Sequence, residues 1–137
     1  MRKAFADTLY WLAVVSPSDP WKESAERAKG SLGPARLVTT DEVLAEFLAA
    51  LGKGGPILRH KAAETVRAIM KNVNVTVVPQ SRDSFLRALD RYEGRHDKAY
   101  SLTDCSSMNV MDQEDIRDVL TNDHHFEQEG YNVLIKQ

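Results

Sequence analysis

Short apolar runs alternate along the chain with longer segments in which apolar residues recur every three or four positions. Short runs bounded by polar or turn residues are typical of buried strands, and the longer periodic segments are typical of amphipathic helices. The pattern predicts these strands: Arg2–Ala6, Arg36–Val38, Val75–Val78, Ile116–Leu120 and Asn132–Ile135.

Helices are expected between the strands, with ends marked by capping residues, proline and glycine. Asp19 is predicted to cap a helix that has Pro20 at its first position. Thr39, followed three residues later by Glu42, forms a capping-box pattern that predicts the start of another helix. The expected helices are Thr8–Val15, Asp19 to about Leu32, Thr39–Leu51, Pro56–Asn72, Ser81 to about Gly94, one after the turn at Ser101–Asp104, and a short one from Asn122.

Strands that alternate with helices along the whole chain predict an α/β protein with a parallel sheet covered on both faces. The 137 residues suit a single domain, residues 1–137. No apolar run approaches the roughly 18 residues that span a bilayer, so no membrane association is expected. The single cysteine, Cys105, cannot form an internal disulfide. Together with the lack of a recognisable signal sequence, this favours a reducing, cytoplasmic location.

The net charge of −2 argues against binding of nucleic acid by bulk attraction, but the charges are unevenly distributed. The segment Lys53–Lys71 is basic and contains one acid, Glu64, whereas Asp112–Glu129 is acidic and contains one arginine, Arg117. A basic segment opposite an acidic, metal-neutralised one could hold a polyanion backbone. Two solvated helix faces of unlike charge explain the same pattern equally well.

Carboxylates fall at the places where ligands collect in open parallel sheets, outside the carboxyl ends of the strands. Asp7 follows the first predicted strand, Asp123 follows the fourth, and Asp104 occupies the first turn of its helix. A fourth acid is expected from the helix that starts at Thr39. Glu42 lies nearly opposite the apolar stripe of that helix and is used in capping, whereas Glu46 lies nearer the edge of the stripe, so Glu46 is favoured.

Each acid taken singly has an ordinary role, such as ending a strand, capping a helix or facing solvent. Their joint placement instead indicates a metal site, because clustered carboxylates repel one another and raise a pKa unless a cation is bound. An all-oxygen ligand set suits Mg²⁺ or Mn²⁺ rather than structural zinc. Such ions activate water and stabilise phosphate charge, which points to phosphodiester hydrolysis.

Four local strings resemble the acidic motifs of PIN-domain ribonucleases, in the right order and over nearly the whole chain. The similarity is to the VapC-type toxins and their solitary relatives. The strings are Phe5-Ala6-Asp7-Thr8, Val38-Thr39-Thr40 through Glu46, Tyr100-Ser101-Leu102-Thr103-Asp104-Cys105-Ser106-Ser107, and Leu120-Thr121-Asn122-Asp123-His124-His125-Phe126.

The resemblance implies a Rossmann-like three-layer fold with a central parallel sheet and an Mg²⁺- or Mn²⁺-dependent endoribonuclease acting on RNA. Asp7 and Asp104 would hold the main ion, and Glu46 and Asp123 would contribute through water or a second ion. Members of the family often form homodimers, and toxin members are silenced by a cognate antitoxin. Asp97 could add a ligand, but a solvated loop acid is the better interpretation.

Other residues have ordinary interpretations that are preferred. His124 and His125 are neighbours without a cysteine partner, and packing or surface roles are favoured over zinc binding or general-base catalysis. Four aromatic residues could stack on bases, although packing in a core or interface is the safer interpretation. They are Trp11, Trp21, Tyr92 and Tyr131.

Two other functions stay open. A non-catalytic PIN-fold module could bind nucleic acid or protein and use the acids for a structural cation, although a scaffold has no need of four acidic motifs. A receiver-like phosphotransfer domain also uses acids at strand ends, but the strand ending at Val78 supplies no phosphorylatable aspartate.

Overall fold

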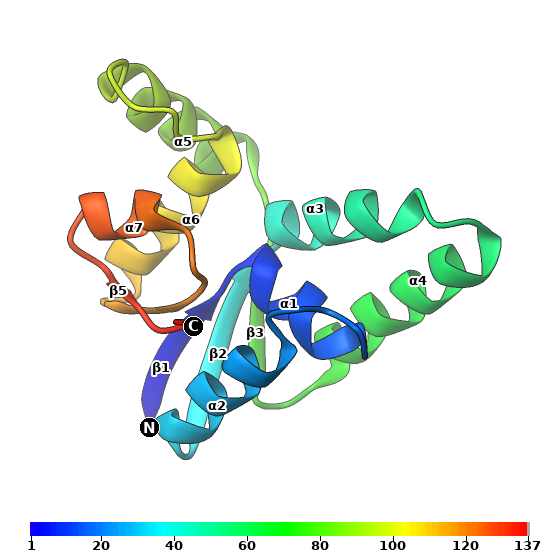
Figure 1. The fold of residues 1–137 in the computed structure, drawn as a ribbon. Coiled ribbons are helices and arrows are strands. Elements are labelled where there is room, and N and C mark those ends of the chain that lie inside the picture. Colours follow the sequence, from blue (N-terminus) through cyan, green and yellow to red (C-terminus); the bar gives the residue numbers. More distant parts are fainter. Residues whose placement is uncertain (137) are drawn as a thin grey trace.

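The computed structural model describes residues 1–136, and its centre is a parallel sheet with helices on both faces (Figure 1). Within those residues the sheet has five strands in the order β3-β2-β1-β4-β5. This confirms the expected α/β class and the three-layer arrangement. The strands are β1 (Arg2–Ala6), β2 (Ala35–Thr40), β3 (Val75–Val78), β4 (Asp118–Leu120) and β5 (Asn132–Val133).

Strand β1 lies at the centre of the sheet, where it pairs on both sides and buries its apolar residues 4–6. Phe5 lies opposite Val38 of β2 and Val119 of β4, and all three side chains are buried. Every pairing is parallel, so the carboxyl ends of the strands lie at one edge of the sheet. The residues that follow β1, β2 and β4 therefore meet at that edge.

The helices occupy the segments between strands (Figure 1). In the figure α1 and α2 lie over the near face of the sheet, α3 and α4 pack together and extend to the right, and α5 packs against α6 at the upper left. The helices are α1 (Thr8–Val15), α2 (Lys22–Leu32), α3 (Asp41–Gly52), α4 (Pro56–Lys71), α5 (Arg82–Gly94), α6 (Leu102–Gln113) and α7 (His124–Gln128).

The predicted capping box of Thr39 and Glu42 is wrong, because β2 continues through both threonines. The N-cap is Thr40, whose Oγ1 accepts a hydrogen bond from the backbone N–H of Val43 at 3.1 Å. Thr39 is fully buried and donates its hydroxyl to the carbonyl of Ala6 at 2.8 Å. A threonine at the end of a strand and one that caps a helix look alike in sequence, and pairing with β3 decides between them.

Asp19 does not cap α2, which begins three residues later than predicted, at Lys22. Its Oδ1 accepts a hydrogen bond from the backbone N–H of Trp21 at 2.8 Å, which closes a turn around Pro20. Asp side chains make such two-residue turns as readily as they cap helices. The other predicted helices begin and end within a few residues of their expected positions.

The core contains large apolar side chains from the sheet and from both helical layers. Phe5, Phe47 and Phe126 are fully buried, and so is the free cysteine Cys105. Cys105 therefore behaves as a small core residue, as expected. Within residues 1–136 no helix is both long enough and apolar enough to cross a bilayer.

Candidate metal centre

An open pocket of about 430 Å³ lies at the carboxyl edge of the sheet, and all four predicted acids line it. Asp7 enters from the end of β1, Glu46 from α3, Asp104 from α6 and Asp123 from the start of α7. These residues are far apart in the chain, and the parallel topology brings them together. We refer to this cavity as the acid pocket.

Asp7 is the most deeply placed of the four acids, with 7% of its surface exposed. Its Oδ2 accepts a hydrogen bond from the Thr121 hydroxyl at 2.9 Å. Burial raises its pKa to about 7, and the charges of Asp104 and Glu46 add to this effect. Hydrogen bonds from the Thr8 backbone and from Thr121 act in the opposite direction and do not compensate. Asp7 is therefore a carboxylate whose charge the bare protein stabilises poorly.

Asp104 is held at the first turn of α6 by a reciprocal cap with Ser101. The Ser101 hydroxyl accepts from the Asp104 backbone N–H at 3.0 Å, and Asp104 Oδ2 accepts from the Ser101 backbone N–H at 3.1 Å. The amino end of a helix favours a negative charge. This cap keeps the carboxylate at the wall of the acid pocket.

Asp123, expected near the start of the last helix, is the N-cap of α7. Its Oδ1 accepts from the His125 backbone N–H at 2.9 Å, and its own backbone N–H donates to the Thr121 hydroxyl at 3.2 Å. Thr121 therefore contacts both Asp7 and Asp123. One buried hydroxyl thus links the two acids that follow neighbouring strands.

His125 belongs to the acid pocket, which the sequence did not reveal. Its Nδ1 lies 3.1 Å from Asp104 Oδ2 and 3.4 Å from Asp123 Oδ1. These three residues each offer a ligand atom, and the atoms lie within 4.8 Å of one another. The signal that could have found His125 is its place two residues after a helix-capping acid. His124, in contrast, is 73% exposed and faces Glu127, in line with its predicted surface role.

Glu46 and Glu42 lie one turn apart on α3 and have different surroundings. Glu46 lines the acid pocket, where its Oε1 accepts a hydrogen bond from the Thr8 hydroxyl at 2.7 Å. Glu42 turns toward α6 and accepts a hydrogen bond from the buried Ser106 hydroxyl. The preference for Glu46 over Glu42 agrees with this placement.

The residues of the acid pocket fit a hard divalent cation. Among residues 1–136 no Lys or Arg side chain lines the pocket, so beside the imidazole of His125 its carboxylates have no counter-charge from the protein. Four carboxylates from separate elements supply the oxygen donors that Mg²⁺ and Mn²⁺ prefer. Asp97 lies outside the pocket, is exposed, and has its Oδ2 3.8 Å from Lys98 Nζ.

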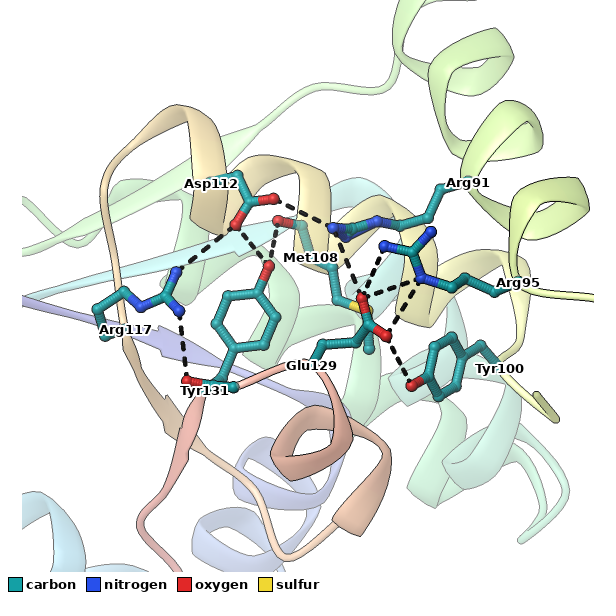
Figure 2. Close-up of polar contacts among 9 residues, drawn as sticks. Arg91, Arg95, Tyr100, Met108, Asp112, Arg117, Glu129 and Tyr131 are labelled. Atoms are coloured by element: carbon teal, nitrogen blue, oxygen red, sulfur yellow. Dashed lines mark hydrogen bonds and ion pairs between the residues drawn. The ribbon is translucent and has the colours of Figure 1, made fainter. Parts of the chain in front are cut away.

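A polar network around Glu129 holds the segment that leads into α6 (Figure 2). Glu129 accepts hydrogen bonds from Arg95 Nε at 3.2 Å and from the Tyr100 hydroxyl at 3.0 Å. Burial alone would raise the pKa of Glu129, but the bonds from Arg95 and Tyr100 and the charge of Arg91 lower it overall. The Tyr100 ring packs against the His125 ring, 5.2 Å between centroids.

The charged segments have separate structural positions. The basic segment Lys53–Lys71 includes all of α4. This helix ends at Lys71, shortly before β3 begins, and therefore at the sheet edge opposite the acids. Several acids of the segment Asp112–Glu129 form ion pairs with arginines. These pairs are Asp112 with Arg91, Asp118 with Arg2, and Glu129 with Arg95.

Comparisons with known proteins agree on one family. Residues 4–129 match the family model of the PIN domain. Among solved structures, the chain is similar to the crystal structure of Mycobacterium tuberculosis VapC20, which is described as a toxin that cleaves the sarcin–ricin loop. The two share 26% sequence identity with a TM-score of 0.85, over 97% of this chain and 99% of that one. A search of curated proteins found no significant match.

Proposed function

Since the chain belongs to the PIN-domain family, we propose that it is a metal-dependent endoribonuclease that hydrolyses phosphodiester bonds in RNA. The observation that carries the proposal is the acid pocket. Asp7, Glu46, Asp104 and Asp123 converge there at the carboxyl edge of the sheet, and among residues 1–136 no Lys or Arg lines it, the basic side chain present being His125. Four carboxylates gathered without a Lys or Arg counter-charge favour a cation.

We assign distinct roles to the residues of the acid pocket. Asp7 and Asp104 hold the main Mg²⁺ or Mn²⁺ ion, and Glu46 and Asp123 contribute through water or a second ion. Bound there, such an ion supplies activation of water and neutralisation of the charge that develops on the phosphate. The Thr8 hydroxyl orients Glu46, and the Thr121 hydroxyl orients Asp7.

RNA is proposed as the substrate on the basis of the PIN-domain family and the likeness to VapC20, which is described as cleaving the sarcin–ricin loop. The same likeness supports a role as the toxin of a toxin–antitoxin pair, with a cognate antitoxin as partner. We further propose a homodimer and a cytoplasmic location.

The direct test is cleavage of total cellular RNA by the purified wild-type protein and by Asp104→Asn, with Mg²⁺, Mn²⁺ or chelator, followed by sequencing of the new ends. Discrete ends made by the wild-type protein only when metal is present are expected. Asp97→Asn is the matched control, because it makes the same chemical change at an exposed acid outside the acid pocket.

Two results would contradict the proposal. Equal cleavage by Asp104→Asn and wild type would exclude Asp104 from the metal site. Salt-sensitive binding of RNA with no products under either metal would favour the non-catalytic module.

A further inference from the structure

A second pocket, of about 370 Å³, adjoins the acid pocket. It lies between the end of α5 and the segment that leads into α6, and its lining includes Tyr92, Arg95, Lys98 and Tyr100. Ala99 lines both pockets. The volume falls within the ~300–1,000 Å³ of small-ligand sites. We refer to this cavity as the tyrosine pocket.

The wall between the two pockets is held in place by the network of Figure 2. Arg95 and Tyr100 both bind Glu129, so the two ends of this wall are tied to one carboxylate. Tyr100 also packs its ring against His125, which lines the acid pocket. Because Ala99 is exposed and lines both pockets, a chain molecule in the acid pocket can continue across Ala99 into the tyrosine pocket.

Tyr92 is the aromatic side chain in position to stack on a ligand there. It lies in the last turn of α5 and is 51% exposed. Trp11 and Tyr131, which the sequence also offered for stacking, are 6% and 4% exposed and belong to the core. An exposed tyrosine ring stacks on any base, because every base has a π-face.

The charges of the tyrosine pocket suit a backbone phosphate. Arg95 is paired with Glu129, at 3.1 Å between Nη2 and Oε1, and is largely neutralised. Lys98 has only a 3.8 Å contact with the exposed Asp97, and such surface pairs contribute little. The ammonium group of Lys98 is therefore available to pair with a ligand. Glu93 also lines the pocket and opposes it, which favours a ligand whose phosphate lies on the Lys98 side.

Two other places in the molecule fit a bound RNA less well. A cavity of about 340 Å³ lined by Met1, Trp11 and Asn74 lies where the strands begin, at the edge opposite the acids. The basic helix α4 reaches the same opposite edge at Lys71. Neither place is continuous with the acid pocket through a shared lining residue.

We propose that the tyrosine pocket binds an unpaired nucleotide that flanks the scissile phosphodiester, with Tyr92 stacked on its base and Lys98 on a backbone phosphate. The position of this nucleotide next to the cleaved bond rests on the proposed function. The binding of single-stranded RNA does not, and it is measured separately.

Binding is tested by fluorescence anisotropy with labelled single-stranded RNA of randomised sequence, about 12 nucleotides long. Chelator is present, so that no cleavage occurs. Tyr92→Ala is expected to weaken binding roughly 10-fold, as loss of one stacked base does. Tyr92→Phe keeps the ring and is expected to stay within about twofold of wild type.

Lys98→Gln is compared with Lys71→Gln, an identical loss of charge on α4. A phosphate contact in a single strand contributes about 0.7 to the slope of log affinity against log salt. Lys98→Gln is expected to lower the slope by that amount, and Lys71→Gln to leave it unchanged. Unchanged binding in both Tyr92→Ala and Lys98→Gln would overturn the proposal, as would an effect of Lys71→Gln alone.

A parallel cleavage assay with metal separates the two proposals. If wild type cleaves RNA and Tyr92→Ala cleaves it equally well at limiting substrate, the tyrosine pocket is rejected and the nuclease stands. If wild type cleaves nothing but Tyr92→Ala and Lys98→Gln still weaken binding, the nuclease is rejected and the tyrosine pocket stands as a binding site for RNA.

Discussion

The Thr8 hydroxyl donates a hydrogen bond to Glu46 Oε1 at 2.7 Å, which joins the first turn of α1 to the second turn of α3. Thr8 directly follows Asp7, so the same turn positions two acids of the pocket. Glu46 is otherwise exposed, and a long exposed side chain has many rotamers. The bond therefore restricts Glu46 to the acid pocket.

The first prediction separates Glu46 from Glu42. Glu46→Gln is expected to lower metal-dependent cleavage of RNA by about 10–100-fold, because a neutral amide is a poor partner for a hydrated cation. Glu42→Gln, the same change one turn earlier, is expected to have little effect, because Glu42 faces Ser106. Initial rates at fixed Mn²⁺ measure both. A larger loss in Glu42→Gln would mean that the fourth acid is Glu42.

A second prediction concerns Thr8 itself. Thr8→Val removes the hydroxyl with little change of shape and is expected to lower cleavage about 10-fold through the orientation of Glu46. Thr8→Ser restores a hydroxyl and is expected to recover most of the rate. A dependence of the deficit on Mn²⁺ concentration would identify weaker metal binding as its cause. Equal activity of Thr8→Val and wild type would mean that the bond has no role in catalysis.

The elements of the fold were predictable where local sequence decides them. The apolar run of β1 and the proline-started α4 were expected with nearly their observed ends. The use of Thr40 instead of Thr39 as the N-cap of α3 was not predictable. It depends on the pairing of β2 with β3, which lies more than thirty residues away in the chain. Local signals such as caps cannot report a partner that far along the chain.

In the acid pocket too, some features follow from local sequence and others depend on packing between distant segments. Asp7, Asp104 and Asp123 were expected at one edge because strand ends meet there, and the four motif strings belong to a family that the PIN-domain match confirms. The position of His125 depends on how α7 packs on α6, and the network of Glu129 joins it to Arg95 across 34 residues. Such contacts follow from packing and carry no periodic signal.

A third prediction follows from the raised pKa of Asp7. Its pKa is about 7 in the folded chain and near 3.8 when unperturbed, so the folded form holds a proton that the unfolded form releases. Without metal, the free energy of unfolding should therefore fall as pH rises from about 4 through about 7, by an upper bound of roughly 4 kcal/mol.

Asp7→Asn isolates this effect, because asparagine stays neutral and its oxygen still accepts from Thr121. In chelator the variant is expected to be more stable than wild type at about pH 8, with the difference disappearing near pH 4. Urea denaturation at several pH values measures it, and Asp97→Asn, the same chemical change at an exposed acid outside the acid pocket, is the matched control. A pH-independent difference would show that the Asp7 carboxyl titrates normally.

A fourth prediction concerns added metal. Millimolar Mn²⁺ is expected to raise the melting temperature by roughly 5 °C, because the ion binds the assembled acids and not the unfolded chain. Asp7→Asn combined with Asp104→Asn should abolish the shift. An equal shift in this double variant would mean that the metal binds elsewhere. The wild-type shift should grow with pH, because Asp7 must lose its proton to bind the ion.

The last prediction tests the network around Glu129. Glu129, 12% exposed at its side chain, faces Arg91 and Arg95, and Arg91 Nη1 is buried without a hydrogen-bond partner in the described chain. Glu129→Gln removes the compensating charge and should cost about 1–3 kcal/mol of unfolding free energy near neutral pH. Tyr100→Phe removes one donor, keeps the ring against His125, and should cost about 1 kcal/mol.

The stability contributed by the charge of Glu129 should depend on pH. The pKa of Glu129 is below its ordinary value of 4.5, because the bonds from Arg95 and Tyr100 outweigh the opposing effect of burial. The stability that its charge provides is therefore present above about pH 4.5 and is lost as pH falls through the lower folded-state pKa. The difference in unfolding free energy between wild type and Glu129→Gln, measured by urea denaturation, should become smaller in acid. A difference that stays constant would mean that Glu129 contributes through packing and not through its charge.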